Sequence, residues 1–164
     1  MALVFIGLGS NIGDGRVNLQ DAWQRLGAIR GLNKIGLSSP YLSSPVGMTS
    51  NQWFTNAVGV LQTSIEANDL LALLLEVESD MGRNRSAGDD RIIDLDILYY
   101  DDLICHSANL DLPHPEISNR LFVLAPLTEL APDHLHPVTG QSSRQMQRLQ
   151  PIMGQEIKKI TWND

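Results

Sequence analysis

The sequence predicts an α+β fold in which helices pack on one face of a ferredoxin-like antiparallel sheet. Apolar runs with strand periodicity alternate with amphipathic helical stretches in the order strand, helix, strand, strand, helix, strand. A further helix and strand extend this pattern at the C-terminal end. No repeat, low-complexity tract or linker interrupts the 164 residues, so we expect residues 1–164 to form one domain.

Two helices are predicted where apolar residues recur at spacings of three and four, over residues 18–26 and 68–81. Gly82 is well placed to end the second helix. The first helix follows the Gly-rich turn "GLGSNIGDG", in which Ser10 or Asn11 is expected to cap it. That turn lacks the lysine of a phosphate-binding loop and the spacing of a nucleophile elbow, so it predicts a structural turn.

The strands are predicted from short apolar or alternating runs that are bounded by turn residues. In chain order these strands are residues 3–8, 33–42 (ending near Pro40), 54–61 and 92–100. Beyond them, the pattern predicts a helix over 122–130, another near 141–149, and a final strand near 156–162.

Composition narrows the classes of partner. The net charge of −7 makes the chain a poor general binder of nucleic acid, because phosphate contacts need a basic surface. No run approaches the roughly 18 apolar residues of a membrane helix, and the N-terminus lacks the features of a secretory signal. Cys105 is the single cysteine, which excludes an internal disulfide and fits a reducing cytoplasm. We therefore expect a cytoplasmic protein that binds small molecules.

The strand over 92–100 carries two aspartates on one face. Asp94 and Asp96 would lie about 6.5–7 Å apart at Cα, so their oxygens can converge on one divalent cation or on two. An edge strand with solvated aspartates is the alternative. Apolar flanking residues on both faces predict a central strand, and together with three upstream arginines they favour a site for metal and phosphate. These arginines are Arg83, Arg85 and Arg91. Strict alternation would also place Leu98 and Tyr100 on the face of the aspartates, and Tyr99 on the opposite face.

Two further groups of residues fit such a site. Phe54 and Asn56 share a strand face, and an aromatic ring beside an amide suits a flat heterocycle, although core packing is the alternative. His114 lies between two prolines that stiffen its segment, and Arg120 follows it. A solvated loop histidine is the alternative there.

Together these segments resemble the 6-hydroxymethyl-7,8-dihydropterin pyrophosphokinases of folate biosynthesis. The matching pieces occur in the order of that family and span nearly the whole chain: "LGSNIGD", "YLSSPVG", "FTNAVGVLQT", "LLEVESDMGRNR", "RIIDLDILYYDD", "LPHPEISNRLFVLAPLTELAPD" and "HPVTG". The resemblance implies a ferredoxin-like monomer. Its implied activity is transfer of the pyrophosphoryl group of ATP to the hydroxymethyl group of a reduced pterin, which leaves AMP.

The resemblance also implies roles for individual residues. Two Mg²⁺ ions would bridge Asp94, Asp96 and the ATP phosphates. The pterin would stack between Phe54 and Phe122, with its edge contacted by Asn56 and by backbone groups of Ser43 and Val46. The residues matched to the ATP site are Glu78, Arg85, Ile97, His114 and Arg120. Arg83 and Arg91 match arginines that stabilise charge in the transition state.

One segment departs from the family pattern. Members usually carry a loop close to Arg-Trp-Gly-Pro-Arg before the strand, whereas this chain has "SAGDDR". Of that loop only Arg91 clearly matches, and Asp89 and Asp90 add negative charge where we expect the triphosphate. Three hypotheses stay open: a pyrophosphokinase with a different loop, a paralogue that binds pterin or nucleotide with weak or no transfer, and transfer to another pterin alcohol.

Overall fold

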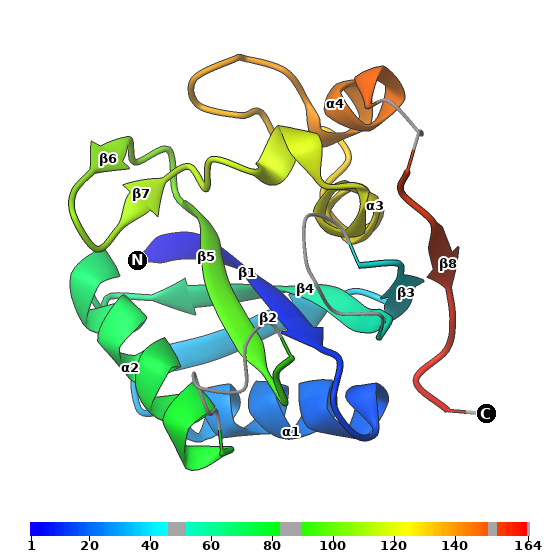
Figure 1. The fold of residues 1–164 in the computed structure, drawn as a ribbon. Coiled ribbons are helices and arrows are strands. Elements are labelled where there is room, and N and C mark those ends of the chain that lie inside the picture. The colour runs from blue at the N-terminus through cyan, green and yellow to red at the C-terminus, as the bar shows by residue number, and fades with distance from the viewer. Residues whose placement is uncertain (46–51, 83–89, 151–153, 164) are drawn as a thin grey trace.

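The computed structural model describes residues 1–45, 52–82, 90–150 and 154–163. Its centre is an antiparallel sheet with the strand order β5-β1-β4-β3-β8, while β2 also pairs with β4, as Figure 1 shows. The strands of this sheet are β1 (Ala2–Ser10), β2 (Leu32–Leu37), β3 (Tyr41–Ser43), β4 (Phe54–Thr63), β5 (Asp94–Tyr100) and β8 (Ile157–Lys159). A separate short pair consists of β6 (Cys105–His106) and β7 (Asp111–Leu112).

Helices cover both faces of this sheet, whereas the sequence predicts one covered face. They are α1 (Gly15–Ala28), α2 (Ala67–Asp80), α3 (Leu121–Leu130) and α4 (Ser143–Leu149), with a 3₁₀ turn (Ile117–Asn119) before α3. In Figure 1, α1 and α2 lie below the sheet, and α3 and α4 lie above it. The central strands β1 and β4 are buried along most of their length, so both of their faces need apolar cover. Among the described residues, no helix has the length and apolar character needed to span a membrane.

A β-bulge in β5 changes which layer each tyrosine joins. Phe5 of β1 pairs with Tyr99 and Ile6 pairs with Ile97, so Leu98 is an extra residue on β5. Tyr99 therefore packs with Leu98 in the α3 layer, and Tyr100 packs against the opposite core. The predicted alternation is confirmed for Leu98, which lines the cavity with the aspartates, and it is wrong for Tyr99 and Tyr100 because the bulge inserts Leu98 as an extra residue. It holds for the two aspartates, which precede the bulge.

The first helix begins later than its predicted cap. Asp14 caps α1, and its carboxylate accepts a hydrogen bond from Val17 N–H at 3.3 Å. Gly13, with a φ of 73°, allows the turn to continue to this aspartate. Ser10 and Asn11 are therefore not the cap, and they make other contacts within and beyond the turn.

Two other residues predicted to end an element, Gly82 and Pro40, do lie at the end of one. Gly82 follows α2 with a φ of 91°, and its N–H donates to Ser79 O at 3.0 Å, so the predicted helix end is confirmed. The predicted strand 33–42 divides near Pro40 into β2 and β3. Proline lacks the N–H that a sheet ladder requires, which explains the interruption.

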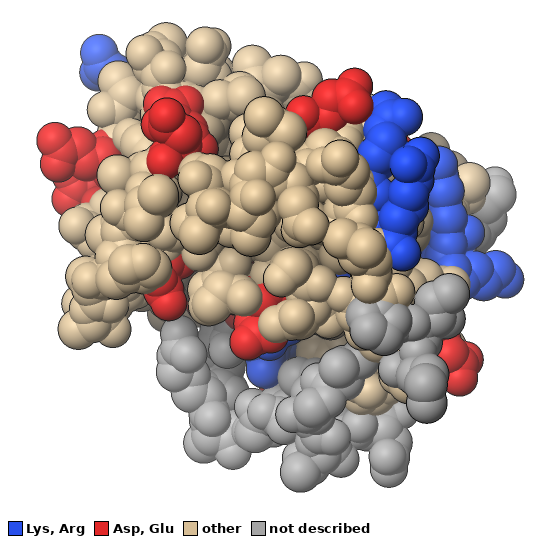
Figure 2. Space-filling view, turned by 90° about the horizontal axis from the view of Figure 1, so that it is seen from above, with Lys and Arg blue, Asp and Glu red and all other residues tan. Residues whose placement is uncertain are grey.

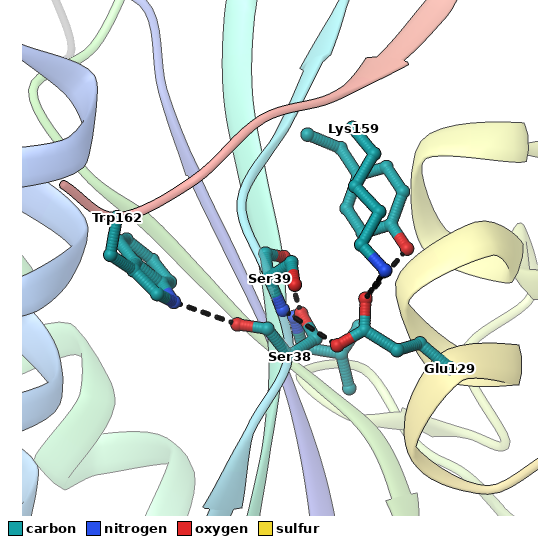
Figure 3. A network of polar contacts seen from close by, with 7 residues as sticks. Ser38, Ser39, Glu129, Lys159 and Trp162 are labelled. Atoms are coloured by element: carbon teal, nitrogen blue, oxygen red, sulfur yellow. Dashed lines mark hydrogen bonds and ion pairs between the residues drawn. The ribbon is translucent and has the colours of Figure 1, made fainter. Parts of the chain in front are cut away.

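A polar network around Glu129 ties the C-terminal strand to α3 and β3 (Figure 3). Glu129 Oε2 accepts from Ser39 N–H at 2.8 Å, and its Oε1 accepts from Tyr41 Oη–H at 2.8 Å. Lys159 Nζ lies 3.4 Å from the same Oε1. Burial alone would raise the pKa of Glu129, but the hydrogen bonds from Ser39 and Tyr41 and the charge of Lys159 hold it below its usual value. The ionised carboxylate therefore stabilises the packing of α3 on the sheet.

Replacing Glu129 with Gln should lower the free energy of unfolding at pH 7 by about 1–3 kcal/mol, because charge-assisted hydrogen bonds become neutral ones or are lost. The folded-state pKa lies below the unfolded one, so this stabilisation is complete above the unfolded value and is lost as the pH falls through the folded value. Urea unfolding should therefore separate variant and wild type at pH 7 and bring them together below about pH 3. The exposed Glu76→Gln change on α2 is the matched control. An equal difference at both pH values would contradict a role for the ionised group.

Candidate functional site

A cavity of about 260 Å³ opens between β1, β4, β5 and the start of α3. Nearly all of the described candidate residues line it: Ser43, Phe54, Asn56, Arg91, Asp94, Asp96, His114, Arg120 and Phe122. Figure 2 shows that acidic side chains are spread over one face of the molecule, while basic ones gather along an edge of it. In a chain with a net charge of −7, an anionic ligand in the cavity therefore depends on the arginines that line it.

Two groups outside the sheet hold the outer edge of β5 at the aspartates. The prediction of a central strand is wrong: β5 is the last strand of the sheet, and among the described residues no strand pairs with its outward backbone groups. Glu78 of α2 is 3% exposed, and its Oε2 accepts from Leu95 N–H at 2.7 Å. On the other side of Asp96, His114 N–H donates to Leu98 O at 2.9 Å. These two bonds fix the backbone on both sides of Asp96, so its carboxylate projects into the cavity from a rigid strand.

The two aspartates form an electrostatically unfavourable pair in the absence of a cation. Burial, then the neighbouring charge of Asp94 and that of Glu78, raise the pKa of Asp96 to about 7, against the opposing effects of Arg120 and Arg91. Within the described part of the chain, no group of three or more His, Cys, Asp and Glu side chains is arranged to hold a metal. Mg²⁺ accepts one or two carboxylates completed by substrate phosphates and water. Asp94 and Asp96 fit this donor set, and a bound cation would relieve their repulsion.

Each arginine of the cavity lies over one of its aromatic rings. Arg91 Nη1 is 3.2 Å from Asp94 Oδ2, and its guanidinium carbon is 5.9 Å from the centre of the Phe54 ring. The guanidinium carbon of Arg120 is 5.6 Å from the centre of the Phe122 ring. Both distances suit a cation–π contact. The cavity thus combines flat apolar surfaces with adjacent groups that can bind phosphate.

The amide of Asn56 is oriented by Ser43. Asn56 is 5% exposed, and its Nδ2 donates to Ser43 Oγ at 2.7 Å. With Nδ2 engaged in this way, Oδ1 is left as an acceptor beside the cavity. A side chain at Gly9 would lie 3.1 Å from this Oδ1, so glycine keeps the space in front of the amide open.

His114 is a neutral hydrogen-bond donor near pH 7. Burial and then the charge of Arg120 hold its pKa below the usual value, although Glu116 and two aspartates act in the opposite direction. Its Nδ1 accepts from Glu116 N–H at 3.1 Å, so the ring proton resides on Nε2. The imidazole can therefore donate from Nε2 to a ligand oxygen without adding charge.

Several predicted residues lie elsewhere. Glu78 is buried beneath β5, and Ile97 is 4% exposed in the core that faces α1 and α2. Neither side chain lines the cavity, and their proposed contacts with ATP stay predictions. Val46, Arg83 and Arg85 lie outside the described residues, as does Asp89 of the divergent loop.

The sequence interpretation missed Gly7, Gly9 and Leu98, which also line the cavity. The sequence predicts a structural turn for the "GLGS" string, but Gly7 and Gly9 are spaced by two on β1 and share the cavity face. Two glycines on one face of a buried strand are the signal that predicts close approach of a ligand.

The chain is similar to known proteins. A family model described as 7,8-dihydro-6-hydroxymethylpterin-pyrophosphokinase (HPPK) matches residues 5–132. The 2-amino-4-hydroxy-6-hydroxymethyldihydropteridine pyrophosphokinase of Methylorubrum extorquens is 38% identical over 134 residues, which are 81% of this chain and 85% of that protein. The similarly named protein of Aquifex aeolicus is 36% identical over 84% of this chain and 86% of its own length.

Longer proteins are also similar to this chain. The folic acid synthesis protein fol1 of Pneumocystis carinii is 36% identical over 96% of this chain, which spans only 21% of that protein. Wild-type HPPK-DHPS of Plasmodium falciparum, solved with SDX-DHP, superposes with a TM-score of 0.73 at 13% identity, over 90% of this chain and 44% of that one. The superposition shows a shared fold.

Replacing Asp96 with Asn should stabilise the metal-free protein at alkaline pH. A folded-state pKa of about 7, raised from 3.8, means that the stability of the wild type falls as the pH rises through this interval. The free energy of unfolding of the variant, relative to the wild type, should therefore rise by about 2–4 kcal/mol between pH 4 and pH 8. Urea unfolding in the presence of a chelator measures this difference. The exposed Asp102→Asn change serves as control, and a pH-independent difference for Asp96→Asn would refute the strained carboxylate pair.

Proposed function

The chain belongs to the 7,8-dihydro-6-hydroxymethylpterin-pyrophosphokinase family, and we propose that its cavity holds the pterin beside Phe54 and Phe122 and the ATP phosphates beside Asp94 and Asp96. The reaction transfers the pyrophosphoryl group of ATP to the hydroxymethyl group of 6-hydroxymethyl-7,8-dihydropterin, as a step of folate biosynthesis. The observation that carries the assignment of the site is one cavity that combines two carboxylates, two arginines and two aromatic rings.

The pterin end is supported by the orientation of its polar and apolar groups. Phe54 and Phe122 offer ring faces on which a flat heterocycle can stack. Asn56 offers Oδ1 as an acceptor for an N–H on the edge of the pterin, since Ser43 engages its Nδ2. Backbone groups of Ser43 and Val46 would complete the contacts with this edge.

The phosphate end is supported by charge. We assign the pair Asp94 and Asp96 to two Mg²⁺ ions, which when bound would neutralise phosphate charge and polarise the bond that breaks. Arg91 and Arg120 lie where they can bind phosphate oxygens, and neutral His114 can donate from Nε2. Arg83 is assigned with Arg91 to the stabilisation of transition-state charge, and Arg85, Glu78 and Ile97 to the binding of ATP.

In the reaction, the hydroxyl oxygen of the pterin forms a bond to the β-phosphorus. The bond from that phosphorus to the oxygen that bridges to the α-phosphate breaks, AMP leaves, and the hydroxyl proton passes to solvent. Alignment and charge neutralisation dominate this type of transfer, so the proposed mechanism uses no dedicated base. The chain contributes a rigid strand for the metal ligands and fixed guanidiniums for the phosphates.

Two finer properties are part of the proposal. We propose that the chain acts as a monomer, since the described cavity is built from residues of one chain. We also propose that residues 1–164 form one catalytic unit in the cytoplasm, which agrees with the single cysteine.

The decisive experiment measures AMP formation by the purified protein with ATP, Mg²⁺ and 6-hydroxymethyl-7,8-dihydropterin. AMP should appear only when all three are present. If calorimetry detects binding of the pterin but no AMP is released, the chain is a binding paralogue. If AMP appears only with a different pterin alcohol, the acceptor has been misassigned.

Replacing Asp96 with Ala should lower kcat by about 1,000-fold or more, because the proposed metal site loses half of its carboxylate ligands. Metal-free binding of the pterin, measured by calorimetry, should change little, since Asp96 is not among the proposed pterin contacts. Asp102→Ala on the exposed turn after β5 is the control. Turnover close to that of the wild type in Asp96→Ala would exclude the two-metal assignment.

A further inference from the structure

A hydrogen-bonded anchor joins the turn after β1 to the residues that precede β5. Asn11 is 6% exposed and makes three contacts across this gap. Its N–H donates to Arg91 O at 3.0 Å, its Oδ1 accepts from Arg91 N–H at 2.7 Å, and its Nδ2 donates to Asp90 Oδ1 at 2.9 Å. One buried residue thereby engages both backbone groups of Arg91, its own N–H bonding the C=O and its side chain the N–H, and the same side chain also bonds the carboxylate of Asp90.

The anchor fixes the point from which the guanidinium of Arg91 reaches the cavity. This side chain is only 17% exposed, and it lies between Asp94 and the ring of Phe54. An arginine has many rotamers, and its position depends on where its Cα is held. With both the N–H and the C=O of Arg91 bonded to Asn11, the Cα cannot shift without breaking buried hydrogen bonds.

The same contacts change the interpretation of Asp90. The sequence suggests that this aspartate opposes the triphosphate, but it is not among the residues that line the cavity. Its carboxylate is directed to the amide of Asn11. We infer that Asn11 and Asp90 are positioning residues that hold the guanidinium of Arg91 in place for phosphate. This role deepens the proposed function and rests on it.

An exchange of the two polar groups tests the anchor. In Asn11→Asp alone, two carboxylates face each other and the donor to Asp90 is lost, so kcat should fall by about 10- to 100-fold with a smaller change in KM. In Asp90→Asn alone, an amide oxygen still accepts from Asn11 and kcat should stay within about 3-fold of the wild type. In the double variant Asn11→Asp/Asp90→Asn, the new carboxylate accepts from Arg91 N–H and from the new amide. The double variant should regain kcat to within about 3-fold.

A second cycle separates positioning from general stability. In an Arg91→Lys background the guanidinium is absent, so Asn11→Asp should cost no more than about 2-fold in kcat. Thermal unfolding of each variant shows whether it folds. A full 10- to 100-fold loss in the Arg91→Lys background, or failure of the exchange to restore kcat, would overturn the positioning role.

A readout without turnover keeps the inference independent of the proposed reaction. The Nε–Hε NMR signal of Arg91 should shift in Asn11→Asp and return toward the wild-type position in the double variant. An unchanged signal in Asn11→Asp would also overturn the positioning role. If these shifts occur but the wild type forms no AMP, the proposed function is wrong, whereas the positioning of Arg91 by Asn11 and Asp90 is supported.

Discussion

Two carboxylates on the edge strand of an apolar sheet are the constraint around which this molecule is arranged. An edge strand leaves backbone groups unpaired, and adjacent carboxylates that are partly buried repel one another. Neighbours of β5 reduce both problems: Glu78 and His114 each bond one backbone group of its outer edge, and Arg91 pairs with Asp94. Burial, and then the charges of Asp94 and Glu78, still raise the pKa of Asp96 against the opposing effects of Arg120 and Arg91. The remaining unfavourable energy favours the binding of a cation, as expected of a site shaped for function rather than for stability.

The two layers of the fold have different tasks in meeting this constraint. The layer of α1 and α2 supplies the large core and, through Glu78, one support of β5. The layer of α3 supplies Arg120 and Phe122 at the start of the helix, so the position of that helix decides whether the cavity has its second arginine and its second ring. The network around Glu129 holds the far end of α3 against β3, which carries Ser43. This network thereby connects two elements, α3 and β3, that each contribute residues to the cavity.

The spacing of residues along single segments predicted those features of the site that lie within one strand. The common face of Asp94 and Asp96 follows from the two-residue period of a strand, and it holds until the bulge at Leu98. By contrast, α3 covers the second face of the sheet because of its tertiary placement. The spacing of apolar residues within a segment does not predict which face a helix will cover. The contact between Asn11 and Asp90 joins residues that are 79 positions apart, and no pattern in either segment indicates it. Gly7 and Gly9 could have been found, since two glycines on one strand face leave space for a ligand.

The charges of the described cavity residues bear on how the phosphates of ATP can bind. Among the described lining residues, Asp94 and Asp96 offset Arg91 and Arg120, so these four groups offer a triphosphate no excess positive charge when all are ionised. Metal ions held by the proposed ligands Asp94 and Asp96 would add positive charge here and favour the binding of phosphates. On the proposed assignment, the carboxylates would link nucleotide binding to the metal, and Arg91 and Arg120 would bind the phosphates beside it.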